Sequence, residues 1–260
     1  PRQGRRDARR AEPAPELQRP RPVQRAHLGR DRQTILEVWE AVGAYQRGLI
    51  DRERLDAIER IACPGPGTCA GNFTANTMGT ACEFLGIAPL GAGMVPADDL
   101  EERRRAAAEY GALATRLTTT ARTFLDGRAL RNAMAGIAAT GGSTNGLLHL
   151  LAIAREAGVE IELDELVEIS ARTPVIGNLS PSGRHVATDL HDIGGVPVVV
   201  AELIRAGLVD GDAPTITGGT LAEATAGAAA PDGVVVHTVE QPYKPPGGLV
   251  ALRGNLAPEG

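Results

Sequence analysis

The stretch CPGPGTCAGNFTANTM, residues 63–78, decides how the surrounding chain folds, because its prolines and glycines exclude an ordinary helix or strand over its first half. Beyond it, apolar residues recur at roughly helical spacing: Phe73, Met78, Ala81 and Leu85. Cys69 is therefore predicted to lie in a tight loop just before a helix N-terminus. The helix dipole and the free N–H groups there favour a thiolate, which suits a metal ion or an iron–sulfur cluster.

The cysteine pattern leaves a second interpretation open. An isolated cysteine is also commonly a small buried hydrophobic residue. The spacing Cys63-x5-Cys69-x12-Cys82 matches no standard zinc motif, since the chain has no Cys-x-x-Cys and no His-x3-His pair. Cys82 falls within the predicted helix and is assigned to the core.

Composition excludes several classes of protein. The 260 residues are 43% hydrophobic, which is enough for one sizeable core or two small ones. Three cysteines indicate a reducing compartment rather than a disulfide-bonded secreted protein. Since no apolar run reaches the roughly 20 residues of a membrane span and no signal peptide opens the chain, we expect a cytoplasmic protein with no membrane partner.

Charge is distributed unevenly. Residues 1–32 hold ten arginines against four acidic residues, whereas the remainder holds 17 basic against 28 acidic residues. The acidic body argues against a nucleic-acid partner. Residues 1–26 lack apolar periodicity, so we predict disorder there. A basic arm is an alternative, and so is non-native, misread GC-rich sequence, because the chain has 26 arginines and one lysine, Lys244.

Periodicity predicts alternating helices and short strands, which indicates a layered α/β fold. Helices are expected over 34–45, 51–61, 99–118, 131–139, 146–154, 163–170, 196–206 and 220–228, and strands over 159–163, 173–179 and 234–237. The expected caps are Asp51, Asp98 or Asp99, Asp164 and Asp189. The residues expected to face inward from 99–118 are Leu100, Ala107, Ala108, Leu113 and Leu117. His149 is expected to be a core histidine.

A second glycine-rich loop, Thr140–Asn145, leads into an apolar helix. Such a turn directs several N–H groups and hydroxyls at one spot, which suits a carboxylate or a phosphate. Ser143 or Thr144 acting only as a helix cap is the alternative. The stretch Thr188–Asp192 mixes two carboxylates with His191, but the three side chains cannot all face one ion in regular structure, so Asp189 is assigned as a cap.

Several separate motifs resemble, in order, those of the dihydroxy-acid and sugar-acid dehydratase family. They are the segment from Cys63 to Pro89, then GGSTN at 141–145, PSGR at 181–184, ATDLH at 187–191 and GGLVALRGNLAP at 247–258. The resemblance runs from about His27 to the end. FTANTM at 73–78 favours the branched-chain amino-acid enzyme within that family. Gly177, Asn178 and Gly219 depart from the family pattern.

The resemblance implies a set of ligands, of which this chain carries one. Cys69 matches a ligand of an iron–sulfur cluster, [2Fe–2S] or [4Fe–4S], whose open iron binds the leaving hydroxyl. Mg²⁺ binds the carboxylate end of the dihydroxy acid, and a serine alkoxide takes the proton. The remaining cluster cysteines and a magnesium-binding Cys-Asp-Lys motif precede the matching region, and the serine follows it. We therefore expect no catalytic residue within the 260 residues, and substrate contacts only from Ser143, Thr144 and Asn145.

The expected organisation is that of an internal fragment. Residues 1–26 are disordered or non-native, 27–240 form a partial α/β cluster-binding domain, and 241–260 form a linker toward an absent C-terminal β-barrel domain. The expected function is that of a dihydroxy-acid dehydratase fragment, from a homodimeric parent in valine and isoleucine biosynthesis. A sugar-acid dehydratase fragment and an inactive truncated product are the alternatives.

Overall fold

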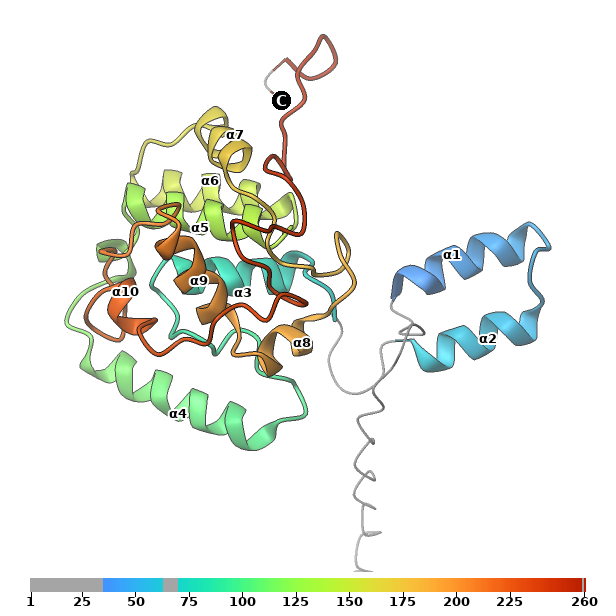
Figure 1. The fold of residues 1–260 in the computed structure, drawn as a ribbon, viewed down its shortest axis with the longest axis horizontal. Coiled ribbons are helices and arrows are strands. Elements are labelled where there is room, and N and C mark those ends of the chain that lie inside the picture. Colours follow the sequence, from blue (N-terminus) through green and yellow to red (C-terminus); the bar gives the residue numbers. More distant parts are fainter. Residues whose placement is uncertain (1–34, 63–69, 259) are drawn as a thin grey trace, which may run out of the picture. The chain divides into compact units, whose positions relative to one another are not determined.

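The computed structural model describes residues 35–62, 70–258 and 260 (Figure 1). The predicted disorder of residues 1–26, and the loop with Cys63 and Cys69, lie outside the described residues. The described helices are α1 Ile35–Gln46, α2 Arg52–Ile61, α3 Thr74–Phe84, α4 Leu100–Arg116, the 3-10 helix η1 Ala121–Thr123, α5 Gly127–Ala139, α6 Asn145–Ala157, α7 Leu163–Arg172, α8 Ala187–Asp192, α9 Val196–Arg205 and α10 Leu221–Ala224.

Helices α1 and α2 form a hairpin with a small apolar core of its own. Ala41, Leu55 and Ile58 are buried between the two helices. Asp51 caps α2 as predicted, because its carboxylate accepts a hydrogen bond from the Arg54 amide at 2.8 Å. Trp39 stays 62% exposed, so the apolar face of α1 is only partly used.

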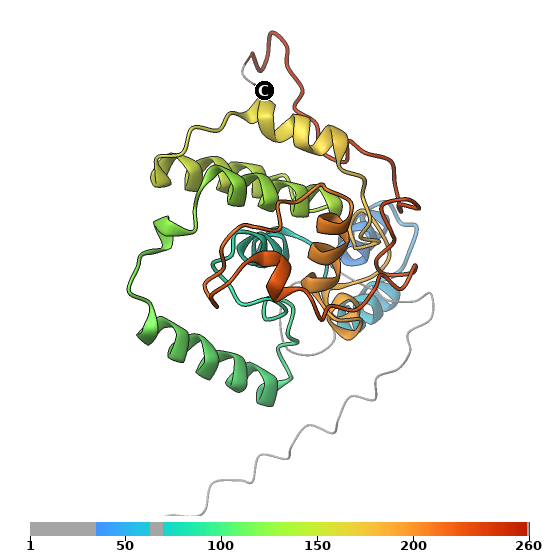
Figure 2. The same cartoon turned by 60° about the vertical axis from the view of Figure 1, so that its left-hand side comes forward.

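The main core is built around α5, which is buried from Ala129 to Ala139 except for the exposed Arg131. Helices α3, α6, α7 and α9 all contact it (Figures 1 and 2). Alanines and glycines dominate α5, so its neighbours approach its backbone closely. A Cβ added to Gly136 would lie only 2.5 Å from the ring of Phe84, the last residue of α3. This contact fixes the distance between α3 and α5.

Regular strands are absent among the described residues, and β pairing is limited to isolated bridges. The predicted strand 173–179 is extended and pairs at Val175 with Lys244 and at Gly177 with Val236. It does not continue as a sheet strand, because the amides of Ile176 and Gly177 both donate to the Ala139 carbonyl at the end of α5. The predicted strand 234–237 is reduced to the single bridge at Val236.

The predicted strand 159–163 is wrong, because its first residue closes a helix instead. The Val159 amide donates to the Ala154 carbonyl at 2.9 Å, and Gly158 between them has a left-handed backbone with φ of 75°. Ile161 then turns into the main core.

Helix α4 forms as predicted and is capped by Asp99, whose carboxylate accepts from the Glu102 amide at 2.9 Å. The prediction of its inward face is wrong, because no residue of α4 is buried. Leu100 is 58% exposed, Ala107 and Ala108 are exposed, and Leu113 and Leu117 are half-buried. Helix α4 therefore contributes little apolar burial to the main core.

Three smaller predictions also need correction. His149 lies on the exposed side of α6 rather than in the core. Asp164 is not a cap, because it is the second residue of α7, whose N-cap is Glu162. The Asp164 carboxylate instead pairs with Arg253. Helix α10 is a single capped turn, much shorter than the predicted 220–228.

Residues 241–249 lie against the main core. Val175 and Lys244 exchange two backbone hydrogen bonds of 3.1 and 3.0 Å. The Gly247 amide donates to the Ser170 carbonyl, and the Leu249 amide donates to the Ser170 hydroxyl. Apolar side chains further along stay exposed: Val250, Leu252 and Leu256.

A fully buried carboxylate, Glu83, joins α3 to the loop that follows it. Its two oxygens accept hydrogen bonds from the amides of Gly91 at 2.7 Å and Gly93 at 2.9 Å. Burial raises the pKa of Glu83 from 4.5 to about 7, and the two amide hydrogen bonds oppose this only in part.

The contact between Gly136 and Phe84 predicts opposite effects for two helical glycine-to-alanine substitutions. Gly136→Ala should lower the free energy of unfolding by about 1–3 kcal/mol, because the new methyl overlaps a buried ring. Gly111→Ala, within α4 and with open space around it, should raise the same free energy by about 0.5–1 kcal/mol through helix propensity. Urea unfolding measures both, and equal effects would contradict the packing described.

The buried Glu83 predicts a pH-dependent stability. Because its pKa is higher in the folded chain, the folded state holds more protons between pH 4.5 and 7, and stability falls as pH rises through that window. The loss attributable to Glu83 is about 3 kcal/mol at most. Unfolding of wild type and Glu83→Gln from pH 5 to 8 isolates this contribution, and parallel pH profiles would refute it.

Candidate functional site

The segment immediately after Cys69 is bonded to two other motifs. The Ala187 amide donates to the Ala70 carbonyl at 2.7 Å, and the Asn72 amide donates to the Ser180 carbonyl at 2.5 Å. The Asn72 side-chain amide donates to the Thr140 carbonyl at 3.0 Å. The start of α8, the turn before Pro181 and the loop before α6 therefore meet at residues 70–72. Cys69 itself lies outside the described residues.

Close approach requires glycine at the centre of this segment. A Cβ on Gly71 would lie 2.8 Å from the Phe73 ring and 3.0 Å from the Ser180 carbonyl oxygen. The Gly71 carbonyl accepts a hydrogen bond from the Asn76 side chain at 2.7 Å, which ties the segment to the first turn of α3. Helix α3 begins at Thr74, five residues after Cys69, as the sequence pattern predicted.

The predicted substrate contacts Ser143, Thr144 and Asn145 lie where the second glycine-rich loop enters α6. Ser143 is half-buried, and the other two residues are exposed. The Thr144 side chain makes no capping hydrogen bond, whereas the Ser143 hydroxyl accepts from the Asn145 amide at 3.2 Å. Ser143 thus contributes to capping α6, and the hydroxyl of Thr144 does not.

The N-termini of α3 and α6 lie side by side. The Asn145 side-chain amide donates to the Thr74 hydroxyl at 2.9 Å, and the hydroxyls of Thr74 and Ser143 are 3.4 Å apart. Each helix carries a partial positive charge at this end, so the pair favours a negative group nearby. A thiolate just before α3 and a carboxylate beside α6 would both be stabilised by this field.

A buried asparagine shapes the turn that receives Asn72. The Asn178 side chain accepts from the Arg184 amide at 2.9 Å and donates to the Val234 carbonyl at 3.1 Å. Its backbone carbonyl accepts from the His185 amide at 2.9 Å. Asn178 was noted in the sequence only as a departure from the family pattern, and the structure shows it holding three segments together.

Sequence reasoning missed the buried polar residues Asn72 and Thr77, which are 3% and 0% exposed. Both residues stand at core positions in a segment otherwise rich in glycine and small residues. Because buried polar side chains need hydrogen-bond partners, such residues could have indicated contacts to other segments.

The acidic and histidine side chains of the 188–192 stretch do not converge. Asp189 accepts from the Val186 amide at 2.9 Å, as the predicted cap at the start of α8, and also lies 3.4 Å from His185. His191 lies 3.4 Å from Glu102 of α4. Across residues 35–62 and 70–258, no three His, Cys, Asp or Glu side chains group as metal ligands would.

Cys82 lies within α3, as predicted, but it is half-buried rather than part of the core. Burial raises the pKa of its thiol, and the neighbouring Glu83 carboxylate adds to that effect. A raised pKa disfavours the thiolate that binds metals.

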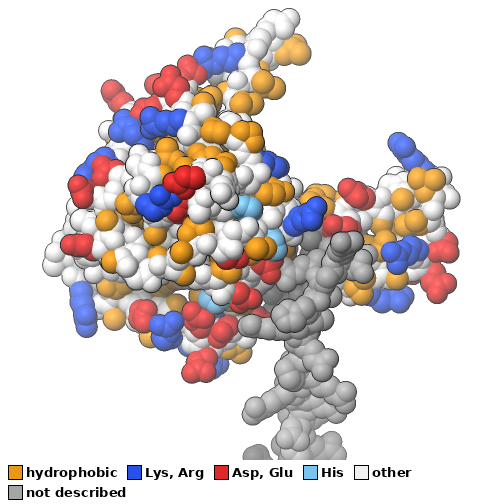
Figure 3. Space-filling view, viewed as in Figure 1, with side chains coloured by type: hydrophobic (Ala, Val, Ile, Leu, Met, Phe, Trp, Pro, Cys, Tyr) orange, Lys and Arg blue, Asp and Glu red, His pale blue; other side chains and the backbone are white. Residues whose placement is uncertain are grey.

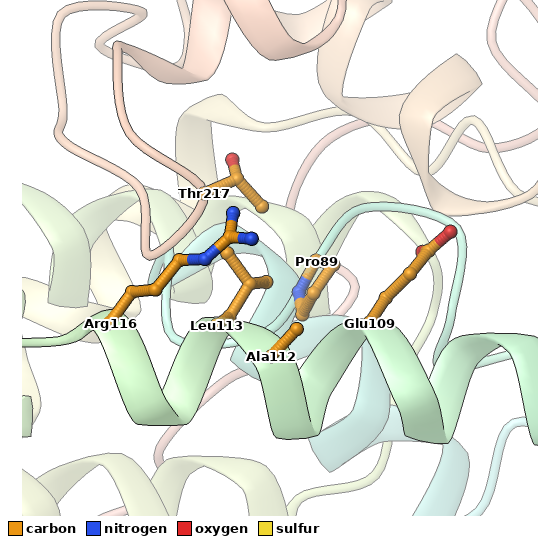
Figure 4. A pocket seen from close by; sticks show the side chains of 6 residues that line it. All are labelled: Pro89, Glu109, Ala112, Leu113, Arg116 and Thr217. Atoms are coloured by element: carbon orange, nitrogen blue, oxygen red, sulfur yellow. The ribbon is translucent and has the colours of Figure 1, made fainter.

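The open pocket in Figure 4 lies apart from this site. It has a volume of about 280 Å³ and lies between α4, which contributes Glu109, Ala112, Leu113 and Arg116, and two loops at Pro89 and Thr217. None of these residues belongs to the segments that meet at residues 70–72.

On the face seen in Figure 3, acidic and basic side chains are interspersed. None of the described helices has the length and hydropathy of a membrane span.

Known proteins are similar to this chain over most of its length. The chain is 47% identical over 230 residues to dihydroxy-acid dehydratase 3 of Bradyrhizobium diazoefficiens, a match covering 87% of this chain and 40% of that protein. It is 48% identical to the dihydroxy-acid dehydratase of Mycobacterium avium over 233 residues, with the same coverage. The dihydroxy-acid dehydratase of Chloroflexus aurantiacus is 49% identical over 242 residues, 90% of this chain and 42% of that protein.

The chain thus spans about 40% of the length of the curated relatives it matches. The sequence model named dihydroxy-acid/6-phosphogluconate dehydratase N-terminal matches residues 20–224. The match confirms the fold class inferred from the resemblance, an N-terminal domain of this type, which in the described residues is mostly helical. The chain belongs to the dihydroxy-acid/6-phosphogluconate dehydratase family and carries its N-terminal domain.

Proposed function

We propose that this chain is part of a hydro-lyase that removes water from a 2,3-dihydroxy acid to give a 2-keto acid, in valine and isoleucine biosynthesis. The observation that carries the proposal is the meeting of the segment after Cys69 with the family motifs at 140–145, 180–184 and 187–191. Relatives named dihydroxy-acid dehydratase support this substrate class. We also propose a cytoplasmic, homodimeric parent.

The reaction removes hydroxide from one carbon and a proton from its neighbour. Hydroxide leaves only with help from a Lewis acid, and the proton needs a base. We propose that Cys69 is one thiolate ligand of an iron–sulfur cluster, [2Fe–2S] or [4Fe–4S], which supplies this Lewis acidity when bound. The paired N-termini of α3 and α6 fit this role, because they stabilise an anionic thiolate and a nearby carboxylate.

Within this chain, the loop before α6 would orient the substrate. Ser143 presents a hydroxyl, and Thr144 and Asn145 present exposed polar side chains at the helix N-terminus. We propose that these three groups hold the carboxylate or a hydroxyl of the dihydroxy acid by hydrogen bonds. The Asn145 side chain, which donates to Thr74, would keep the two helix ends in register while doing so.

We propose that the donors of these 260 residues do not by themselves complete a cluster or a magnesium site. By the resemblance, Cys69 is the one cysteine that matches a family ligand, and Cys82 lies half-buried within α3 with a raised thiol pKa. The sequence contains no Cys-Asp-Lys, and the ammonium of its single lysine, Lys244, donates to the Ser182 carbonyl at 2.6 Å. We propose that the other cluster ligands, the magnesium ligands and the base belong to regions that the longer relatives have and this chain does not match.

The sugar-acid alternative remains a second candidate, because the family description includes 6-phosphogluconate dehydratase. It differs from the first in the length and terminal phosphate of its substrate. An inactive truncated product is the third candidate, and it predicts no turnover with any acid.

The experiment uses the full-length product of the gene that encodes this chain, reconstituted anaerobically with iron, sulfide and Mg²⁺. We expect keto-acid formation from 2,3-dihydroxyisovalerate and not from 6-phosphogluconate. Cys69→Ser should lower kcat at least about 1,000-fold, since the residues of one mechanism act as a unit. Cys82→Ser, a matched change thirteen residues away in α3, should stay within about threefold of wild type.

Reversed substrate preference would favour the sugar-acid reaction, and turnover unaffected by Cys69→Ser would refute the assignment of the cluster ligand. The purified 260-residue chain, given the same treatment, should form no keto acid. Turnover by that chain would show that it contains ligands that its sequence does not reveal.

A further inference from the structure

The hydroxyl of Thr77 joins two segments that lie 71 residues apart. Thr77 is completely buried in α3. Its hydroxyl donates to the Asn72 carbonyl at 3.1 Å and accepts from the Ser143 amide at 2.9 Å. A threonine hydroxyl has one donor and two acceptor sites, so both kinds of site are in use.

Asn72 extends this connection to one further segment and bonds to the loop before α6 a second time. Its backbone amide donates to Ser180, and its side-chain amide donates to Thr140. Thr77 and Asn72 together therefore bind residues 71–72 to the loop before α6 and to the turn before Pro181. Asn72, Thr77, Thr140 and Ser180 are buried and Ser143 is half-buried. Losing one partner therefore leaves a buried polar atom unsatisfied, which costs about 1–3 kcal/mol.

The methyl group of Thr77 is as closely fitted as its hydroxyl. A Cβ on Gly142 or on Gly146 would lie 3.0 Å from the Thr77 methyl carbon. Gly142 in the loop before α6 and Gly146 in the first turn of α6 therefore pack on this methyl, while the Ser143 amide bonds to the hydroxyl. Valine has the same shape as threonine without the hydroxyl, and serine has the hydroxyl without the methyl.

We propose that Thr77 is a positioning residue, which holds Ser143 and Asn145 in a fixed relation to the segment that follows Cys69. The importance of this relation for turnover rests on the proposed function, in which Cys69 and the loop before α6 serve the same dihydroxy acid. Displacement of a binding group by about 1 Å can reduce a rate about 100-fold. Thr77 would touch neither the substrate nor the cluster.

Amide hydrogen exchange of the Ser143 N–H tests the connection directly in the 260-residue chain. Thr77→Val should speed exchange at this amide at least about tenfold, because its acceptor is gone. Thr77→Ser should restore protection to near the wild-type level. Should the valine variant fail to fold, Thr77→Ala removes the same acceptor, and the same loss of protection is expected.

Thr80→Val is the matched control. Thr80 lies one turn further along α3 and is 1% exposed, and its hydroxyl has no hydrogen-bond partner among the described residues. This variant should leave Ser143 exchange unchanged. Unchanged protection in Thr77→Val, or equal loss in Thr80→Val, would overturn the proposal.

Steady-state kinetics of the full-length product test the consequence. Thr77→Val should lower kcat/KM for the dihydroxy acid at least about tenfold at unchanged iron content and visible absorption, and Thr77→Ser should recover to within about threefold. Wild-type kcat/KM in Thr77→Val, alongside an active parent, would overturn the positioning role. An inactive wild-type parent would instead refute the proposed function, and Ser143 exchange alone would then decide whether Thr77 holds the loop.

Discussion

The packing of α3 on α5 is the constraint on which the rest of the structure depends. Gly136 leaves room for the Phe84 ring, and this contact fixes the C-terminal end of α3 against a helix buried along most of its length. The N-terminal end of the same helix bears Thr74 and Thr77, whose hydroxyls bond to the loop before α6. Since α6 also packs on α5, both helix N-termini at the candidate site are held by one core. Close helix packing thereby determines where a thiolate before α3 and a carboxylate beside α6 can lie.

Local sequence signals predicted much of the helical structure, because each signal acts within a few residues. Asp51 and Asp99 accept amide hydrogen bonds as N-caps, as short polar residues before helices do, and Asp189 accepts from the Val186 amide within the first turn of α8. The helix after Cys69 begins where the glycines end, and the loop at 140–145 enters a helix as expected. The family resemblance, carried by several motifs in order, is confirmed by the matching family model and by relatives that are 47–49% identical.

Features set by distant contacts could not be predicted from local pattern. Residues 173–179 have the β-branched character of a strand, but two of their amides donate to the end of α5, so no sheet forms there. Helix α4 has apolar residues at helical spacing and yet buries none of them, since periodicity does not tell whether a partner surface exists. The roles of Asn72 and Thr77 depend on partners about 70 residues away in sequence. The role of Cys69 as a cluster ligand and the domain boundaries stay predictions.

The central claim is that the segment after Cys69 belongs to the same cooperative unit as the α5 core. Native-state hydrogen exchange of the 260-residue chain at increasing urea tests this most directly, through the amides of Asn72 and Ala187, which donate to Ser180 and Ala70. The structure predicts that both amides exchange with the same opening free energy as Ile137 in α5, within about 1 kcal/mol. Exchange of Asn72 and Ala187 by a low-energy local opening, while Ile137 stays protected, would contradict the claim that the core holds this segment in place.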